Sequence, residues 1–214
     1  ILPSILQGKD PSLVALVRSS IVAANREPEN PASWLELGYV YEANSLDSLA
    51  LAAYNRAVAV NHTNARAWYR IFVISHRQGD QERAYEANSR LLELAPDYAP
   101  MHIRSGYWHL DLRRSSEAGL SFQRAVELDP GNPGGHWGLA RIMMLENEPD
   151  RASELLEQLL RRRPEDPYSY QLLGTAYRQA GRWQEAERVL EKGQNGGKVW
   201  PDPWHEEVEK YETG

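Results

Sequence analysis

The chain has 214 residues, of which 42% are hydrophobic and 25% are charged, and no apolar run approaches the roughly 18 residues that a membrane-spanning helix needs. Its formal net charge of −6 at pH 7 disfavours general binding to nucleic acids, because phosphates repel an acidic surface. The absence of cysteine excludes disulfides, thiolate catalysis and cysteine-ligated zinc, and it fits a reducing or an oxidising compartment equally well.

Residues 1–30 contain one predicted helix. Asp10 and Pro11 supply an N-cap and a first-turn proline, and apolar residues follow at helical spacing until Pro28. We expect this N-terminal segment to hold the second helix of a partial repeat. Because no charged and then apolar leader precedes Ile1, we expect a mature or trimmed product, or the repeat region of a longer enzyme or of a secretion or envelope component.

A repeat of 34 residues runs through most of the remaining chain without insertion or deletion. The twentieth position of every repeat is alanine, and the eighth position is small in four repeats out of five. Small residues at fixed positions allow two helices to approach closely, so each repeat is predicted to be a helical hairpin. The predicted repeats cover residues 31–64, 65–98, 99–132, 133–166 and 167–198.

The motifs within these repeats resemble a known family. The first repeat reads Trp34-x-x-Leu37-Gly38-x-x-Tyr41 and then Ala50-x-x-x-Tyr54, and prolines recur between repeats at Pro96, Pro130 and Pro164. Residues 31 to about 195 resemble tetratricopeptide repeats. The resemblance implies an all-α fold, a right-handed α-solenoid of five tandem helix-turn-helix repeats, and we expect a bacterial source. His62 in place of a proline and Asn88 in place of an aromatic residue depart from the family pattern.

The last segment, residues 199–214, is predicted to be a capping helix with an acidic tail. Gly193, Gly196 and Gly197 end the last repeat helix, and the pair Asp202-Pro203 begins a new one. We expect this helix to cover the exposed end of the repeat stack, as terminal layers require.

The resemblance also implies a binding groove, lined by the first helices of successive hairpins. The positions that face the ligand in this family carry six arginines and three acidic residues here, although the chain as a whole is acidic. The predicted partner-binding residues are Tyr39, Arg66, Tyr69, Arg70, Val73, Arg104, Tyr107, Trp137, Arg141 and Arg178. Of the basic and amide positions with which some family members hold a chaperone's C-terminal carboxylate, only Arg104 matches.

Arginine and aromatic side chains are typical of binding hot spots, because they bury large planar surfaces and arginine pairs with carboxylates through two hydrogen bonds. The sequence therefore predicts a non-catalytic scaffold or adaptor that binds a protein or peptide with acidic and apolar side chains. An alternative is that arginine is simply common here, since it supplies 20 of the 24 basic residues.

No cofactor, metal site or catalytic site is predicted. His102 and His109 share a helical face, but seven residues span about 10.5 Å along a helix, which is too far for one ion. These residues and His136 occupy packing positions, so we interpret them as interior histidines with satisfied hydrogen bonds. The sequence shows no nucleophile elbow, phosphate loop or paired acid and base.

A second hypothesis makes the chain a self-assembling subunit. The tail from Asp202 to Glu212 is strongly acidic, and it could enter the arginine-rich groove of a neighbouring copy to build a filament or an oligomer. The ending Trp200-Pro201-Asp202-Pro203-Trp204 resembles tails of bacterial envelope repeat proteins, which slightly favours an envelope or extracellular location over the cytoplasm.

Overall fold

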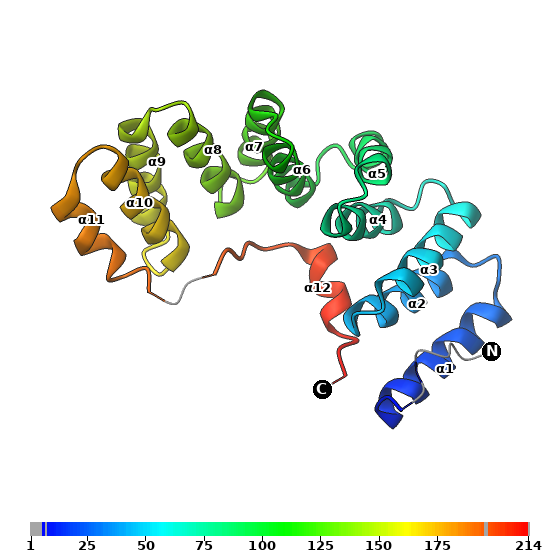
Figure 1. Ribbon diagram of the computed structural model, residues 1–214. Helices are drawn as coiled ribbons and strands as arrows, with labels where there is room; N and C mark the ends of the chain where they lie inside the picture. Colours follow the sequence, from blue (N-terminus) through cyan, green and yellow to red (C-terminus); the bar gives the residue numbers. More distant parts are fainter. Residues whose placement is uncertain (1–5, 7, 195–196, 214) are drawn as a thin grey trace. The chain divides into compact units, whose positions relative to one another are not determined.

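The computed structural model describes residues 6, 8–194 and 197–213, and the regular structure in these residues consists of twelve α-helices without a strand (Figure 1). The chain forms two compact units, one of Ile1–Pro96 with Asp202–Gly214 and one of Asp97–Pro201. In the described part, no helix combines the length and the apolar composition that crossing a membrane would require.

The first unit contains six helices. They are α1 (Pro11–Arg26), α2 (Pro31–Ala43), α3 (Asp47–Val60), α4 (Ala65–Gln78), α5 (Gln81–Leu94) and, from the end of the chain, α12 (Pro203–Glu209). Each of the helices α1 to α4 packs against the next one, and α12 packs against α2. The first unit therefore contains two complete hairpins, the single helix α1 and a helix from the far end of the sequence.

The second unit contains three hairpins. Its helices are α6 (Ala99–Asp111), α7 (Ser115–Leu128), α8 (Pro133–Leu145), α9 (Pro149–Arg162), α10 (Pro167–Gln179) and α11 (Trp183–Leu190). Consecutive helices pack together, and α8 also packs against α6 and α10, the first helices of the neighbouring hairpins. The first helices of successive hairpins thus form a continuous layer within this unit.

The predicted repeat boundaries coincide with helix starts. The first residues of α2, α4, α6, α8 and α10 are those of the five predicted repeats, namely Pro31, Ala65, Ala99, Pro133 and Pro167. Local chemistry places these starts, because a side chain such as that of Asn30 or Asp166 accepts a hydrogen bond from a first-turn N–H and the following proline has no N–H to satisfy. Asp10 caps α1 in the same way.

In three repeats the eighth position is a glycine that faces a large side chain on the second helix, as Gly38, Gly106 and Gly174 do. A Cβ atom added to Gly38 would lie 2.2 Å from the ring of Tyr54, so only glycine fits there. In the second repeat the sizes are exchanged: Phe72 stands at the small position and Asn88 stands where the other repeats have a large residue, and both are buried. The departure at Asn88 is therefore matched by the departure at Phe72.

The C-terminal segment forms the predicted helix in an unexpected place. We expected it to cover the end of the last repeat, but α12 packs against α2 in the first unit. The physical reason is the set of polar and aromatic partners that α2 and α4 offer to it, which are described below. Gly196, one of the three predicted helix-ending glycines, lies outside the described residues, and α11 ends at Leu190.

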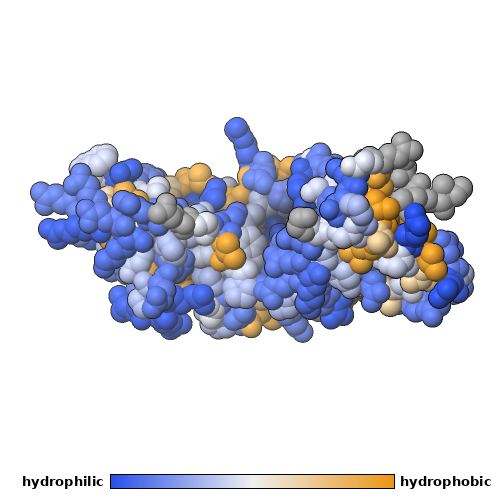
Figure 2. Space-filling model, turned by 90° about the horizontal axis from the view of Figure 1, so that it is seen from below, coloured by the Kyte–Doolittle hydropathy of each residue, from blue (hydrophilic) through white to orange (hydrophobic). Residues whose placement is uncertain are grey.

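One patch of apolar surface lies beside α1. A hollow there is lined by Leu6, Pro11, Val14, Ala15 and Val22 together with polar residues. In Figure 2 apolar atoms interrupt the polar surface at the right, on the side of α1.

Candidate functional site

The chain's own C-terminal segment occupies part of the predicted binding site. We call residues 198–213 the tail, and the side of α2 and α4 that meets residues 202–213 the first face. Five side chains of α2, its C-cap and α4 contact the tail: Tyr39, Asn44, Arg66, Tyr69 and Arg70. Four of these five are predicted partner-binding residues.

The centre of the first face is a buried ion pair. Arg70 Nε donates a hydrogen bond of 2.8 Å to Glu42 Oε2, and Nη2 donates to Oε1 of the same carboxylate. The hydroxyl of Tyr54 donates to Glu42 Oε2 at 2.8 Å. Burial by itself lowers the pKa of Arg70, but the adjacent Glu42 carboxylate more than reverses this effect, so the arginine stays charged.

The same arginine reaches the tail. Arg70 Nη1 lies 3.0 Å from His205 Nδ1 on α12. Since arginine only donates hydrogen bonds, His205 accepts here and its Nδ1 carries no proton. Arg70 therefore links the buried Glu42 to the docked helix.

Tyr69 recognises the start of α12. Its hydroxyl donates to Asp202 Oδ2, and both residues are buried. Asp202 is also the N-cap of α12, because its side chain accepts from the backbone N–H of His205 at 3.3 Å. The ring of Trp204 meets the ring of Tyr69 edge-on with centroids 5.6 Å apart, and Arg66 lies 5.5 Å from the indole centroid.

The second carboxylate of the tail that the first face binds is that of Glu207, about one and a half helical turns after Asp202. Tyr39 donates through its hydroxyl to Glu207 Oε2 at 2.7 Å, and Arg66 Nε donates to Glu207 Oε1 at 3.0 Å. Burial and then the hydrogen bond to Glu207 raise the pKa of Tyr39 well above its ordinary value, so the tyrosine remains a donor. Glu207 thus accepts from two elements, α2 and α4.

Asn44 holds the end of the tail. Its Nδ2 donates to the carbonyl of Tyr211 at 3.0 Å, and its Oδ1 accepts from the hydroxyl of Thr213 at 2.6 Å. The ring of Tyr211 lies 6.0 Å from that of Tyr39. These contacts extend the docked segment beyond the last turn of α12.

A separate contact occurs within the second unit, on the side of α6 and α8 that meets residues 198–201, which we call the second face. The indole of Trp200 stacks on Tyr107 with ring centroids 5.5 Å apart and planes inclined by 21°. Arg104 lies 5.5 Å from the indole centroid. A Cβ atom on Gly134 would lie 3.1 Å from the indole, so the absence of a side chain there leaves space for Trp200.

Positive charge gathers on the second face. Lys198 Nζ lies 3.5 Å from the ring centroid of Tyr107, and the guanidinium of Arg141 lies 5.8 Å from it. Burial of the ammonium group, and next Arg141, lower the pKa of Lys198 to about 8, although the residue as a whole is exposed. The hydroxyl of Tyr107 and Nε1 of Trp200 are buried without a hydrogen-bond partner among the described residues. The second face therefore has two buried donors without an acceptor in the described part of the chain, and three basic residues and the acidic Asp111 lie near its rings.

The other predicted site residues have different surroundings. Val73 is buried, and Trp137, which is 1% exposed, donates through Nε1 to the hydroxyl of Ser169 at 2.8 Å. The ring of Trp137 therefore belongs to the packing between α8 and α10 and offers little surface. Arg178 is exposed on α10.

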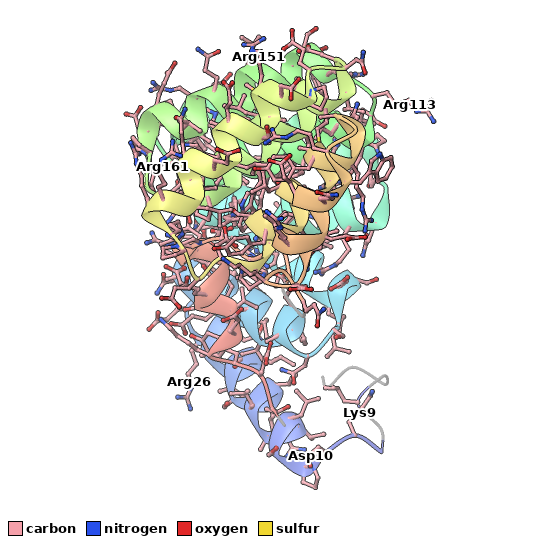
Figure 3. All side chains as sticks on the ribbon, turned by 90° about the vertical axis from the view of Figure 1, so that its left-hand side faces the viewer. Lys9, Asp10, Arg26, Arg113, Arg151 and Arg161 are labelled. Atoms are coloured by element: carbon pink, nitrogen blue, oxygen red, sulfur yellow. The ribbon has the colours of Figure 1, made fainter. Side chains whose placement is uncertain are left out.

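Many arginines elsewhere are solvated, as the alternative interpretation of the composition requires. Arg113, Arg151 and Arg161 are exposed and point outward from the second unit (Figure 3). Arg66, Arg70, Arg104 and Arg141 differ from them because each one lies against an aromatic ring. Arg56 and Arg182 also lie over rings, so the two faces are distinguished by arginines and rings that meet the tail.

Several residues of these contacts were not predicted as site residues. They are Asn44, Lys198, Trp200, Asp202, Trp204, His205 and Glu207. Charge was the available signal, because an acidic tail accompanies arginine-rich helices. It suggested docking between copies, and nothing in the sequence indicates that the tail docks on its own chain.

Among the described residues, no three or more histidine, aspartate or glutamate side chains are grouped so that they could hold a metal ion. His102 is buried, and His136 Nδ1 lies 3.3 Å from the carbonyl of Asn132. His109 departs from our expectation, because its Nδ1 is buried without a hydrogen-bond partner in the described part of the chain. Burial lowers the pKa of both His109 and His136, which favours their neutral forms.

Family models for the tetratricopeptide repeat match residues 15–61, 48–99, 109–174 and 146–197, and so cover both units. The chain belongs to the tetratricopeptide repeat family. Such repeats are generally non-catalytic modules for protein interaction.

Among curated proteins, this tetratricopeptide repeat chain is similar to parts of much longer ones. It is 31% identical over 105 residues to the Hsp70-Hsp90 organizing protein of Triticum aestivum, a match that covers 49% of this chain and 16% of that protein. It is 27% identical over 173 residues to cellulose synthase operon protein C of Xanthomonas axonopodis pv. citri, which covers 77% of this chain and 11% of that protein. The matches therefore describe the repeats and leave most of each relative unmatched.

Solved structures with the same fold include other tetratricopeptide repeat proteins. One from Parabacteroides merdae superposes with a TM-score of 0.75 at 20% identity, covering 94% of this chain and 81% of that one. YrrB, described as having an unusual peptide-binding site, superposes with a TM-score of 0.67 at 17% identity, covering 83% of this chain and 91% of that one. At these identities the likeness concerns the fold.

Proposed function

We propose that the chain is a non-catalytic scaffold that binds a segment of a partner polypeptide on its arginine- and aromatic-lined helices. The observation that carries the proposal is that both the first face and the second face already contact a polypeptide segment, the tail. A surface that satisfies carboxylates, an indole ring and backbone carbonyls of one segment has the chemistry to hold another.

The expected partner carries acidic and apolar or aromatic side chains. On the second face, Arg104 and Arg141 lie near Tyr107, whose buried hydroxyl has no hydrogen-bond partner among the described residues. An acidic side chain placed there would pair with arginine and could accept from the tyrosine, which the tail residues do not do. A buried donor without an acceptor costs about 1–3 kcal/mol, so a ligand that supplies one has an advantage over the tail.

Charge reversal on the second face tests this function. The full chain is immobilised, and the proteins that it retains from a cell extract are compared with those retained by Arg104→Glu with Arg141→Glu. The matched control is Arg113→Glu with Arg151→Glu, which makes the same change of charge on outward-pointing residues (Figure 3). We expect the control to retain the parent's partners and the second-face variant to lose them. Equal retention by the two variants, with unchanged helix content, would refute the assignment of this face.

Self-assembly is a second candidate function, and the tail contacts favour it. A segment that fits the first face of its own chain also fits the same face of another copy, and exchange of identical elements is a low-cost route to oligomers. Light scattering over a wide range of protein concentrations at low salt tests this. A monomer that persists at the highest concentration would exclude the second candidate.

A further inference from the structure

We propose that residues 202–213 are a built-in competitor on the first face, and that the partner of this face is a foreign segment with the same pattern. This pattern is a short helix opened by Asp-Pro, with an aromatic residue two positions after the aspartate and a glutamate five positions after it. The inference rests on the proposed scaffold function and adds the chemistry of the ligand and the way in which access to it is controlled.

The first face reads three positions of the segment, each in a different way. Asp202 accepts from the buried Tyr69 hydroxyl while it caps α12, so the face recognises a carboxylate that also begins a helix. Trp204 contacts Tyr69 and Arg66 through its ring. Because these positions are only two residues apart, a ligand must present the cap and the aromatic ring together.

Glu207 supplies the third position. It lies on α12 five residues after the cap, and it accepts from the Tyr39 hydroxyl at 2.7 Å and from Arg66 Nε at 3.0 Å. Two donors from two different helices fix both the register and the direction of the segment. A segment with the same residues in another order would place a carboxylate against the aromatic ring of Tyr69 or an indole against a tyrosine hydroxyl.

The tail is held weakly enough to be displaced. Helix α12 has seven residues, too few for a stable helix in water, so the segment gains its order only when it docks. Within α12 only Val208 is buried, and the side chains of the Arg66–Glu207 pair are 51% and 28% exposed, so solvent screens this contact. When the tail leaves, the Tyr39 and Tyr69 hydroxyls lose the carboxylate acceptors that the tail supplied, so a competing segment must supply acceptors of its own.

Tethering compensates for this weak contact. A segment on the same chain has an effective concentration near the millimolar range. To displace the tail, a free ligand needs a ratio of concentration to dissociation constant that exceeds the same ratio for the tail. The apparent affinity of a foreign segment is therefore its intrinsic affinity multiplied by the fraction of molecules in which the first face is open. The tail sets a threshold, so the first face selects ligands that match its pattern better than random acidic peptides do.

The test measures how a fluorescent peptide with the sequence of residues 202–213 binds to full-length chains. The weakened-tail variant carries Trp204→Ala and Glu207→Gln, which leave the first face intact. The matched control is Glu209→Gln, which removes the same charge from an exposed residue of α12. We expect the weakened-tail variant to bind the peptide at least about tenfold more tightly than the parent, and the control to bind like the parent.

Further variants locate the binding site. Adding Tyr39→Phe or Arg66→Ala to the weakened-tail variant should reduce peptide binding, because each change removes one donor to the glutamate. A peptide of the same composition in scrambled order should bind more weakly than the parent sequence. Equal peptide binding by the parent and the weakened-tail variant, with both chains folded by circular dichroism, would overturn the proposal.

Two other results separate this inference from its alternatives. If neither chain binds the peptide while the charge reversal on the second face still abolishes partner retention, the inference fails and the scaffold function stands. If the parent forms dimers that the weakened-tail variant does not form, the occupant of the first face is a second copy, and the assignment of a foreign partner is wrong.

Discussion

Arg70 and Glu42 form a two-pronged ion pair in the first unit, and their side chains are only 1% and 3% exposed. The pair joins α4 to α2, and His205 of the tail contacts it from α12. Removing two charges from water is costly, and only a complete set of hydrogen bonds makes such a pair tolerable. The pair therefore holds the first face in shape at the point where the tail docks.

Breaking this pair should destabilise the first unit strongly. Arg70→Ala removes the two-pronged counter-ion of the buried Glu42 carboxylate and leaves only the guanidinium of Arg77, 3.8 Å away, so it should cost about 3–5 kcal/mol of unfolding free energy. As a control, Arg90→Ala, a change at a side chain that is 57% exposed and pairs with the exposed Glu93, should cost less than about 1 kcal/mol. Urea unfolding of both variants measures the difference.

A double variant separates charge from packing. Glu42→Gln with Arg70→Met removes both charges and keeps an acceptor for the Tyr54 hydroxyl, so it should recover part of the stability lost in Arg70→Met alone. No recovery would mean that the cost comes from lost packing around the arginine and not from an uncompensated carboxylate.

The glycines of the repeats give a second prediction, with a control inside the chain. A Cβ atom at Gly38 would lie 2.2 Å from the Tyr54 ring, so Gly38→Ala should cost about 1–3 kcal/mol despite the better helix propensity of alanine. At Gly119, in the middle of α7, no heavy atom lies within 4 Å of the added Cβ. Gly119→Ala should therefore stabilise the chain by roughly 0.5–1 kcal/mol. Thermal unfolding of the two variants should show shifts of opposite sign.

The repeats were predictable because local signals recur at a fixed period. A helix start at Pro133 or Pro167 follows from a capping side chain and a proline, and Ala152 or Ala186 marks the contact between helices wherever the period places it. Such signals depend on neighbours in sequence. The position of α12 depends on residues about 130 or more positions away, such as Tyr69 opposite Asp202, and no period connects them.

Periodic signals also indicated part of the candidate site. Family positions indicated Tyr39, Arg66, Tyr69 and Arg70, because a residue's place in the repeat determines which side of the helix it occupies. Trp137 fits the same rule, but it is 1% exposed because the adjacent Ser169 accepts its N–H and Tyr168 packs on its ring. A residue's position in the repeat determines the side of the helix on which its side chain lies. Whether that side chain is exposed depends on the side chains of the neighbouring hairpin and of the tail that pack over it.

The pH dependence of the second unit gives a third prediction. In the folded chain the pKa of Lys198 is lowered to about 8 from a value of 10.5, so between these values the unfolded chain binds more protons. The free energy of unfolding should therefore rise with pH in this window. Below the window, the charged Lys198 makes an unfavourable contribution to stability. Urea unfolding at about pH 7.5 and about pH 9.5 should show a gain for the parent that Lys198→Met lacks. A loss of stability in the parent would mean that the attraction of the ammonium to the Tyr107 ring outweighs its burial.

The last prediction concerns the charge of the ligand. An acidic peptide that contains aromatic residues should bind the weakened-tail variant more tightly than its charge-reversed counterpart, because Arg66, Arg104 and Arg141 act locally whereas the net charge of −6 is spread over the whole chain. Raising the salt concentration from roughly 50 to 500 mM shortens the screening length from about 14 Å to about 4 Å, so this preference should shrink. Contacts of aromatic rings with Tyr69 and Tyr107 should leave a remainder that salt does not remove, since buried apolar area responds little to ionic screening. Titrating both peptides at both salt concentrations measures the two contributions. Equal affinities at low salt, or a preference for the basic peptide, would show that these arginines serve the packing of the tail and do not select a ligand.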